Sequence, residues 1–288
     1  MTDNPGSTPQ ERFRALHREG TFLMVNVADQ ATAKAMAATG AAALATSSAA
    51  HAETIGRADA AGDVSLQEHA EHTAGIVTAT DLPVNVDAEN GYGHEPEDVA
   101  ACIRRLAATG AAGAGIEYWS GDPEIGFYDR ALAIARIEAA VEAANALDQP
   151  FTVTGRTECL LYEQPEGMDE TLRRLQGFAD VGAHCLYAPG TWDMSTVRPV
   201  VDGAGGPVNV LALVGAEHPT LEELTEAGVR RVSLGSSLFH AQVAHAASLV
   251  TSILATGRFT ASRANRGQAV QQNHNFRITL EDAGHFHI

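Results

Sequence analysis

The most regular feature of this chain is a repeated pairing of a helical segment with a short apolar segment. Four times a helical stretch ends in a small residue and glycine, and an apolar stretch begins at once: 38–48, 108–117, 180–190 and 226–237. Glycine suits the position after a helix because it adopts a positive φ without a Cβ clash. The pattern therefore predicts short loops that lead from helices into strands.

Further strands and helices fill the chain between these repeats. Apolar runs predict strands at 22–27, 83–87, 151–155 and 208–213. Ser65 and Glu68 form a capping box that opens a helix toward Thr80, and Pro96 occupies a first-turn position in the next helix. Apolar residues at helical spacing predict the remaining long helices, at 96–106, 128–146 and 169–181.

Roughly eight strand–helix units in about 240 residues are typical of a (β/α)8 TIM barrel in the α/β class. The alternative, a doubly wound open sheet, usually carries a glycine-rich phosphate loop after its first strand. Here the first strand continues into VNVADQATA, which contains no glycine. We therefore predict a single (β/α)8 catalytic domain over 1–256. Residues 257–288 are rich in Asn, Gln, His and Arg, and we expect an extension that wraps the body or a neighbouring subunit.

Charge and composition narrow the function. The formal net charge is −17, which disfavours nonspecific binding to nucleic acid or anionic membranes, because both are polyanions. The N-terminal segment lacks the apolar core of a signal peptide, and no run approaches about 18 uninterrupted apolar residues. The three cysteines, Cys102, Cys159 and Cys185, are scattered and form no C-x-x-C pair. We expect a cytoplasmic protein, and we expect the cysteines to be small buried hydrophobes.

The candidate chemistry lies where the predicted strands end. The active site of a (β/α)8 barrel forms at the carboxyl ends of its strands, so the side chains there face one mouth. These residues include four carboxylates, one arginine, one tyrosine and hydroxyl-bearing loops. They are Thr46, Ser47, Ser48, Asp87, Glu89, Glu117, Arg156, Glu158, Tyr187, Ser236 and Ser237.

Acids on neighbouring strand ends repel one another unless a cation lies between them. A set of carboxylates without Cys or His nearby points to a hard cation, and Mg²⁺ fits best, with waters and substrate oxygens completing its octahedron. We therefore predict that Asp87, Glu89 and Glu117 hold Mg²⁺, for which Mn²⁺ could substitute. The alternative is that Asp87 is a turn former and Glu117 a charge beside a helix terminus.

Arg156 and the serine loop are the predicted anion-binding elements. Arg156 suits a carboxylate or phosphonate, and its alternative role is a structural ion pair with Glu117 or Glu158. Ser47 and Ser48 could offer hydroxyls and backbone N–H groups to an anionic ligand, or could form a simple turn. The histidines show no zinc spacing. His51 and His94 fall near the mouth and could transfer protons, although the sequence favours solvated surface histidines.

Several motifs together resemble the isocitrate lyase/phosphoenolpyruvate mutase superfamily. They are LPVNVDAENGYG, GAAGAGIE, FTVTGRTE and TLRRLQGFADVGAHCLYAPG, and the similarity extends over roughly 13–250. The nearest relatives belong to the bacterial branch that is mostly without assigned activity. The resemblance implies a Mg²⁺-dependent barrel enzyme that acts on 2-oxo or 2-hydroxy carboxylates through an enolate. It also implies a homo-tetramer that exchanges its last helix between subunits.

The resemblance also implies roles for single residues. Asp87 matches the principal metal carboxylate, Glu89 stands where many members have Asp, and Glu117 matches the acid after the fourth strand. Arg156 matches the substrate-anion arginine, and Asp59 matches an aspartate beside the substrate in the mutase branch. The loop that holds the carboxylate or oxo group corresponds to Ser47, Ser48 and Ala49, and we include Glu158 among the substrate-binding candidates.

This chain departs from the superfamily after the fourth strand. Lyases carry a mobile K-[KR]-C-G-H loop there, whose cysteine acts as acid and base, whereas this chain has YWSGDPEIGFYDR. Tyr118 replaces a usual Asp, and the Lys and Asn of the mutases and phosphonopyruvate hydrolases are also missing. The histidine that mutases carry on the sixth strand has become Ala188 or a neighbour. We expect a gating loop over 118–130 that has no cysteine role.

These observations favour a Mg²⁺-dependent lyase or decarboxylase that breaks or makes a carbon–carbon bond of a small 2-oxo or 2-hydroxy acid. Tyr187, Asp59 or His51 could donate or accept the proton that the reaction transfers, and the sequence does not choose among them. One alternative is a phosphoenolpyruvate mutase or phosphonopyruvate hydrolase that acts on a phosphorus–carbon bond. Another is an inactive ligand-binding barrel. The last predicted helix, 236–256, is apolar on more than one face, which predicts a homo-tetramer or dimer.

Overall fold

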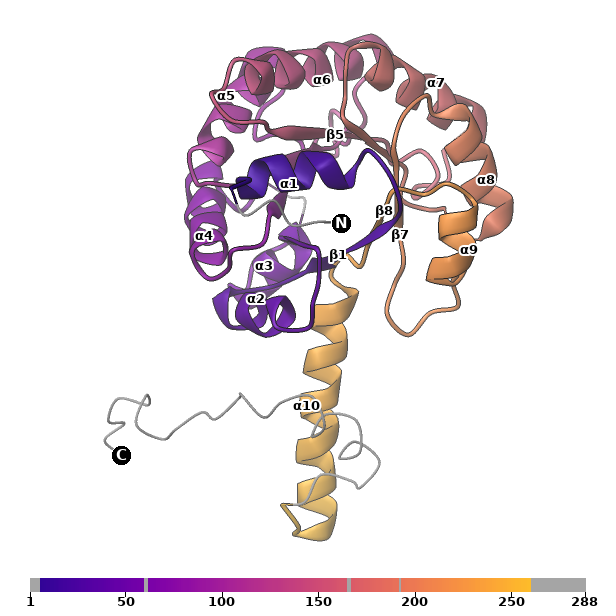
Figure 1. Ribbon diagram of the computed structural model, residues 1–288. Coiled ribbons are helices and arrows are strands. Elements are labelled where there is room, and N and C mark those ends of the chain that lie inside the picture. Colours follow the sequence, from indigo (N-terminus) through magenta and orange to yellow (C-terminus); the bar gives the residue numbers. More distant parts are fainter. Residues whose placement is uncertain (1–5, 60–61, 165–166, 192, 260–288) are drawn as a thin grey trace. The chain divides into compact units, whose positions relative to one another are not determined.

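Eight short parallel strands close into a barrel in the order in which they occur in the chain (Figure 1). The computed structural model describes residues 6–59, 62–164, 167–191 and 193–259. The predicted (β/α)8 barrel is confirmed. The strands are β1 (Phe22–Asn26), β2 (Ala43–Ala45), β3 (Val84–Asp87), β4 (Gly113–Ile116), β5 (Thr152–Arg156), β6 (Cys185–Tyr187), β7 (Val208–Leu211) and β8 (Arg231–Ser233).

Helices alternate with the strands and surround them. Ser65 accepts a hydrogen bond from the Glu68 N–H and so caps α4 as predicted, and Pro96 lies in the first turn of α5. The helix expected from residue 128 begins later, because Asp129 caps it by accepting from the Leu132 N–H. The helices are α1 (Pro9–Leu16), α2 (Gln30–Ala37), α3 (Ser48–Thr54), α4 (Leu66–Thr78), α5 (Pro96–Ala107), α6 (Arg130–Asn145), α7 (Gly167–Asp180), α8 (Met194–Gly203), α9 (Leu221–Glu226) and α10 (Ser237–Thr256).

The amino ends of the strands are covered by α1, which crosses the barrel there (Figure 1). Arg14 on this helix donates to the Phe151 carbonyl, just before β5 begins, at 2.7 Å. Phe13 has no exposed surface and packs against Phe22 of β1. Helix α1 therefore closes the barrel at the amino ends of the strands, and the interior is open to ligands at the carboxyl ends.

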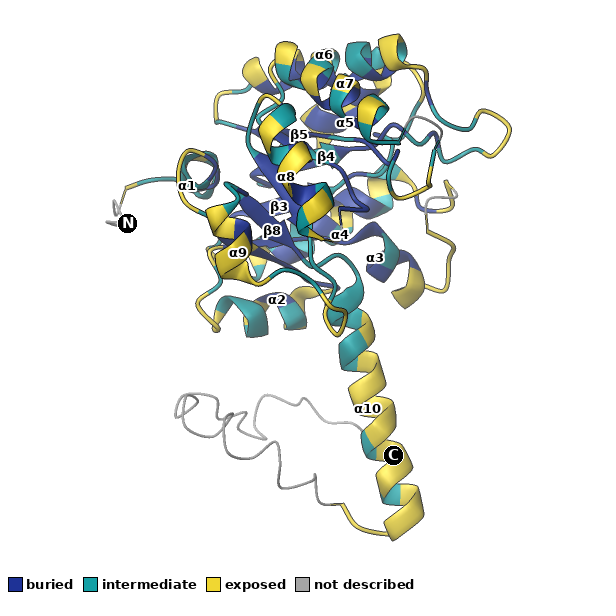
Figure 2. Ribbon diagram, turned by 90° about the vertical axis from the view of Figure 1, so that its right-hand side faces the viewer, coloured by how far each residue is buried: buried dark blue, intermediate teal, exposed yellow. Residues whose placement is uncertain are grey.

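The two faces of each strand bury different side chains. Residues that point outward pack under the helices, and Figure 2 shows the strands as buried inside a ring of helices with exposed outer faces. Gly155 of β5 is required by this packing, because a Cβ there would lie 2.8 Å from the Phe178 ring of α7. The inward positions of β3, β5, β7 and β8 carry polar residues instead. They are Asn85, Asp87, Thr154, Arg156, Asn209, Arg231 and Ser233.

The chain divides into two compact units, 1–241 and 242–288, with the boundary inside α10. None of the residues of α10 is buried, and Val243, Val250 and Leu254 are among its exposed apolar side chains. By length and composition alone α10 is long and apolar enough to cross a membrane, a test that the core helix of a soluble protein and a signal sequence also pass. Most of the predicted extension, 260–288, lies outside the described residues.

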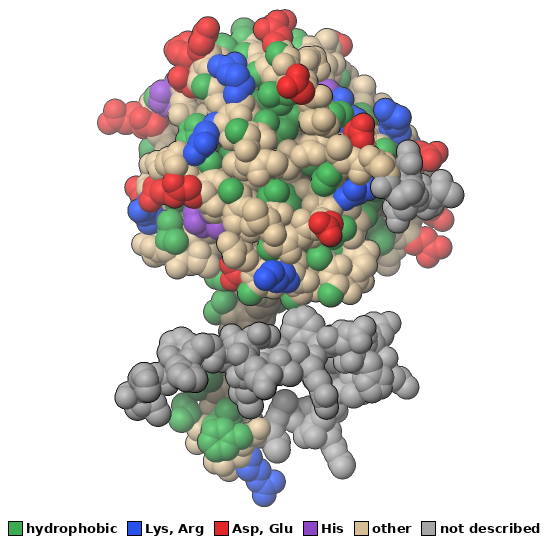
Figure 3. All heavy atoms as spheres, turned by 60° about the vertical axis from the view of Figure 1, so that its left-hand side comes forward, with side chains coloured by type: hydrophobic (Ala, Val, Ile, Leu, Met, Phe, Trp, Pro, Cys, Tyr) green, Lys and Arg blue, Asp and Glu red, His purple; other side chains and the backbone are tan. Residues whose placement is uncertain are grey.

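The surface carries both signs of charge. On the face in Figure 3, acidic side chains are scattered among basic and hydrophobic ones, and the basic side chains occur as single residues or small groups. On this face the acidic side chains do not gather in one block.

Candidate active site

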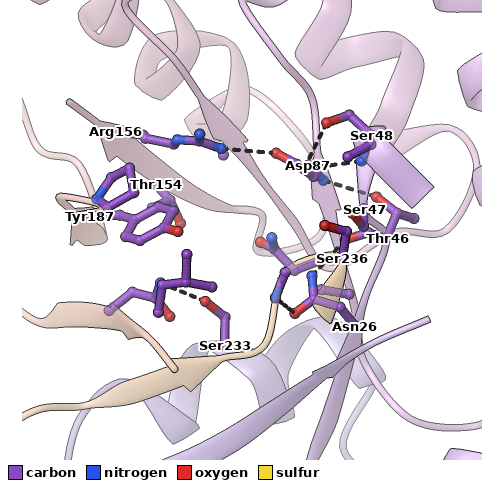
Figure 4. Close-up of a pocket in the computed structure, with 18 of the residues that line it drawn as sticks. Asn26, Thr46, Ser47, Ser48, Asp87, Thr154, Arg156, Tyr187, Ser233 and Ser236 are labelled. Carbon is purple, nitrogen blue, oxygen red and sulfur yellow. Dashed lines mark hydrogen bonds and ion pairs between the residues drawn. The ribbon is translucent and has the colours of Figure 1, made fainter. Parts of the chain in front are cut away.

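A cavity of about 230 Å³ opens at the carboxyl ends of the strands (Figure 4). This is the end of the barrel at which the sequence predicts the active site, because such sites form at the carboxyl ends of the strands. The structure brings most of the predicted residues to its wall. Those that line it are Thr46, Ser47, Ser48, Ala49, Asp59, Asp87, Glu117, Arg156, Tyr187 and Ser236. Glu89, Glu158 and Ser237 do not line it.

Asp87, the last residue of β3, is held by the segment that follows β2. Its backbone N–H donates to the Thr46 hydroxyl at 2.9 Å. Its carboxylate accepts from the Ser48 N–H at 3.1 Å and from the Ser48 hydroxyl at 3.0 Å. Ser47 caps α3 by accepting from the Ala50 N–H. The serine loop therefore orients Asp87 as well as lining the cavity.

Arg156, the last residue of β5, lies among three carboxylates. Its Nη1 is 2.6 Å from the Glu117 carboxylate and 3.4 Å from that of Asp87. Its Nε is 2.6 Å from Glu158, which is fully buried. The structural ion pair considered from the sequence is therefore present, with both Glu117 and Glu158. The role of Arg156 in binding a substrate anion stays a prediction.

One guanidinium does not neutralise this many acids. Burial raises the pKa of Glu117 well above its usual value; the Arg156 charge opposes this shift, and Glu158 and Asp87 add to it. Burial, Asp87 and Asp59 together raise the pKa of Glu89 to about 7. Glu89 also has a φ of 46°, a conformation that residues with a side chain rarely adopt. The mouth of the barrel therefore holds more carboxyl groups than the Arg156 guanidinium can balance, and burial makes it costly to ionise all of them without a further cation.

This donor set fits a hard divalent cation. Its ligands are oxygens, and an added cation would offset the burial and the mutual repulsion that raise these pKa values. Among the described residues, no three His, Cys, Asp or Glu side chains come close enough to form a complete protein cage. Mg²⁺ does not need one, because it usually binds through one or two carboxylates and keeps several waters. Asp87, Glu89 and Glu117 remain the predicted ligands, directly or through water.

Tyr187 and Asp59 are the candidates nearest the cavity for proton transfer. The Arg156 guanidinium lies over the Tyr187 ring, 5.2 Å from its centre. Burial raises the pKa of Tyr187 to about 12, so the phenol stays protonated at neutral pH and is a weaker acid than an exposed tyrosine. Asp59 also lines the cavity, and its charge contributes to the raised pKa of Glu89.

The expectation of a solvated surface histidine is wrong for His51, which is buried, whereas His94 is exposed as expected. His51, the buried His69 and His72 form a histidine cluster between α3 and α4. The His51 and His72 rings stack with centres 3.8 Å apart, and His69 meets His51 edge-on at 5.9 Å. Sequence periodicity missed the cluster because histidine does not count as apolar. His51 does not line the cavity.

The segment 118–130 forms a hairpin-like loop. Trp119 pairs with Phe127, and Gly121 and Gly126 supply the positive φ values of 77° and 70° that the turn needs. No residue from 118 to 130 lines the cavity, but the Trp119 ring stacks on Tyr162, which does. Gating by this loop remains a prediction. The expected burial of all three cysteines is confirmed.

Sequence reasoning missed much of the inner wall. The cavity is also lined by Asn26, Leu161, Tyr162, Asn209, Leu211, Leu213, Arg231 and Ser233. The alternation of side chains along β7 and β8 could have found part of this set, because residues two apart on a strand face the same side. Leu161 and Tyr162 lie in a loop after β5 and carry no such signal.

Comparisons with known proteins identify the family and agree with the fold. A family model described as phosphoenolpyruvate phosphomutase matches residues 13–254. The uncharacterized protein Rv1998c of Mycobacterium tuberculosis is 31% identical over 248 residues, which cover 83% of this chain and 88% of that protein. 2-Methylisocitrate lyase of Escherichia coli is 28% identical over 174 residues, which cover 58% of this chain and 57% of the lyase.

Solved structures of similar proteins support the same fold. A Burkholderia cenocepacia J2315 protein, described only provisionally as a lyase/mutase, has a TM-score of 0.82 and 39% identity. The match covers 87% of this chain and 89% of that one. A 2,3-dimethylmalate lyase superposes with a TM-score of 0.77 at 23% identity, over 93% of this chain and 95% of that one, and this likeness bears on the fold alone.

Proposed function

Because the chain belongs to the phosphoenolpyruvate mutase/isocitrate lyase superfamily, we propose that it is a Mg²⁺-dependent lyase or decarboxylase of a small 2-oxo or 2-hydroxy carboxylate. The reaction would break or form a carbon–carbon bond next to the carbon that carries the oxygen. The observation that carries the proposal is the group of buried carboxylates around Arg156 at the mouth of the barrel. Such a site suits a hard cation and an oxygen-rich substrate.

Each residue has a role in this proposal. Asp87 would hold the cation, and Ser48 fixes its carboxylate through two hydrogen bonds. Arg156 holds Glu117 and Glu158 in place, while its Nη2, which these ion pairs do not use, can face a substrate anion. When bound, a divalent cation supplies Lewis-acid stabilisation of the negative charge that develops on the substrate's α-oxygen.

The proton has two candidate carriers on the cavity wall. Tyr187 is protonated at neutral pH, as tyrosines ordinarily are, and burial makes it a weaker acid by raising its pKa to about 12. It can still donate to the carbon left behind by bond cleavage, because a carbanion is a much stronger base than a phenolate. Asp59 lies on the same wall and can accept a proton when ionised. His51 is less suited, since it lies outside the cavity lining and burial lowers its pKa to about 4.

A phosphorus–carbon enzyme is the second candidate. The position of Asp59 in the cavity wall and the match to the phosphoenolpyruvate phosphomutase model favour it. The loop 118–130, without the Lys and Asn expected of mutases and phosphonopyruvate hydrolases, counts against it. Release of phosphate from phosphonopyruvate would distinguish this candidate from the first.

We further propose that the protein acts in the cytoplasm as a homo-tetramer or dimer. The support is α10, whose apolar side chains Val243, Val250 and Leu254 are exposed in the single chain. Apolar patches of this kind are commonly covered by association. An exchange of α10 between subunits would cover them.

The test is a screen of oxaloacetate, 2-methylisocitrate, 2,3-dimethylmalate and phosphonopyruvate with Mg²⁺, read out as keto-acid product and free phosphate. We expect keto acid from at least one of the three carbon acids, and its loss in Asp87→Asn. Asp148→Asn is the matched control, because Asp148 is exposed in the turn before β5. Binding of these acids by calorimetry without any product would instead indicate an inactive ligand-binding barrel.

A further inference from the structure

A buried arginine lies at the inner end of the cavity. Arg231 opens β8, is only 2% exposed and lines the cavity. It shares the inward face of β8 with Ser233, two residues along the strand. Two residues of strand span about 7 Å, so the Arg231 backbone lies about that much farther from the mouth than that of Ser233.

All hydrogen-bond partners of this guanidinium are neutral. Its Nε donates to the Asn209 amide oxygen at 2.9 Å, and its Nη2 donates to the Thr154 hydroxyl at 3.1 Å. Its Nη1 lies 3.4 Å from Nε2 of His17. Nδ1 of that ring is 2.8 Å from the Phe13 carbonyl, so Nδ1 carries the hydrogen and Nε2 accepts. Burial and the Arg231 charge lower the pKa of His17 to about 3, so this partner is uncharged.

The charge of Arg231 is therefore uncompensated. Within the described ranges, no Asp or Glu forms an ion pair with it, and the acids Asp87 and Glu117 pair with Arg156 instead. Taking a guanidinium out of water without a counter-charge is expensive, and buried cations are normally paired. Arginine has five N–H donors, of which these contacts use three, so two remain for a ligand.

We propose that Arg231 forms a second anion subsite at the inner end of the cavity and binds a carboxylate there. The carboxylate belongs either to the substrate, extending inward past Arg156, or to a free small acid. The substrate version rests on the proposed function. Arg156 is less available for this role, because Glu117 and Glu158 already lie 2.6 Å from it. Asn209 and Thr154 fix the guanidinium plane, as bidentate carboxylate binding requires.

The first experiment needs no turnover. Thermal unfolding of the metal-free protein is measured against sodium formate, with ionic strength held constant by a bulky sulfonate. We expect a saturable rise in Tm of about 4 °C at roughly ten times the Kd. Arg231→Gln should lose this response. Arg230→Gln is the matched control, because Arg230 is the preceding residue, its side chain donates to the Gly20 carbonyl and it does not line the cavity, so the response should be unchanged.

A wild type that does not respond to formate, or an Arg231→Gln protein that responds like the wild type, would overturn the subsite. If Arg231→Gln fails to fold, Arg231→Lys takes its place, since lysine keeps the positive charge but lacks the paired N–H donors of a guanidinium. A weakened but saturable response in Arg231→Lys supports the subsite. A response identical to the wild type in that variant contradicts the bidentate geometry.

A second arm identifies the source of the carboxylate. If the carboxylate is the substrate's, formate inhibits turnover competitively, and Arg231→Gln raises KM for a two-carboxylate substrate tenfold or more with a smaller change in kcat. If it is a free acid, formate stabilises the protein without competing and KM is unchanged. A formate response without turnover on any substrate would refute the proposed function while leaving the subsite standing.

Discussion

The histidine cluster of His51, His69 and His72 predicts a defined loss of stability in mild acid. His69 has no exposed surface, and neither of its ring nitrogens has a hydrogen-bond partner in the described parts of the chain. Burial lowers the pKa of His69 to about 4, and His72 nearby adds to the lowering. Protonating this ring in the folded protein is therefore unfavourable.

Whether stability rises or falls with pH follows from the protonation of His69 in the unfolded and the folded protein. In the unfolded chain His69 binds a proton near pH 6.5, whereas in the folded protein it stays neutral down to about pH 4. Between these values the unfolded state binds more protons, so the free energy of unfolding falls as the pH falls. The difference between the pKa values of His69 in the two states lowers the free energy of unfolding by about 3 kcal/mol once the pH has reached 4. At pH 7.5 the contribution is absent.

The perturbation is His69→Leu, which removes the titrating group without adding a buried charge. The assay is urea unfolding followed by circular dichroism at pH 7.5 and pH 4.5. The wild type should lose about 2 kcal/mol more than the variant between these two pH values. His94→Leu, at an exposed position in the loop before α5, should behave like the wild type. Equal losses in the wild type and His69→Leu would refute the reasoning, because they would mean that His69 is solvated or paired.

Three further predictions concern the site and the assembly. Ser48→Ala removes one of the two hydrogen bonds that Ser48 donates to the Asp87 carboxylate. Mg²⁺ affinity measured by calorimetry should therefore fall about 10- to 100-fold, with little change in Tm. Unchanged affinity would show that Ser48 does not position a ligand. Replacing all three cysteines by Ser or Ala should leave kcat within a few-fold, since all are buried; inactivation of the wild type by a thiol reagent, prevented by substrate, would contradict this. Light scattering at micromolar concentration should give a tetramer or dimer, and a 30.2 kDa species would argue against association through α10.

The barrel could be predicted because its local signals all agree. Helix-ending glycines, the Ser65 capping box and eight apolar runs each indicate one element, and the barrel rule then sorts the strand ends. The same rule predicts Asp87, Glu117, Arg156 and Tyr187 at one mouth, and all four line one cavity in the structure. These positions depend only on where each strand ends.

The remaining features depend on tertiary contacts that no local pattern encodes. Glu158 follows Arg156 by two residues, yet it lies buried beneath the guanidinium rather than on the cavity wall. The histidine cluster needs the packing of α3 on α4, and the neutral surroundings of Arg231 need β5, β7 and α1 together. Sequence alone therefore located the mouth of the site but not its inner end.

The most direct test of the proposed function is metal-dependent keto-acid formation. The purified protein is exhaustively treated with EDTA, and product is then followed from the best of the carbon acids while Mg²⁺ or Mn²⁺ is added back. The buried carboxylates around Arg156 predict that chelation abolishes turnover, that either cation restores it, and that Asp87→Asn requires far more cation for the same rate. Full turnover after complete chelation would contradict the account.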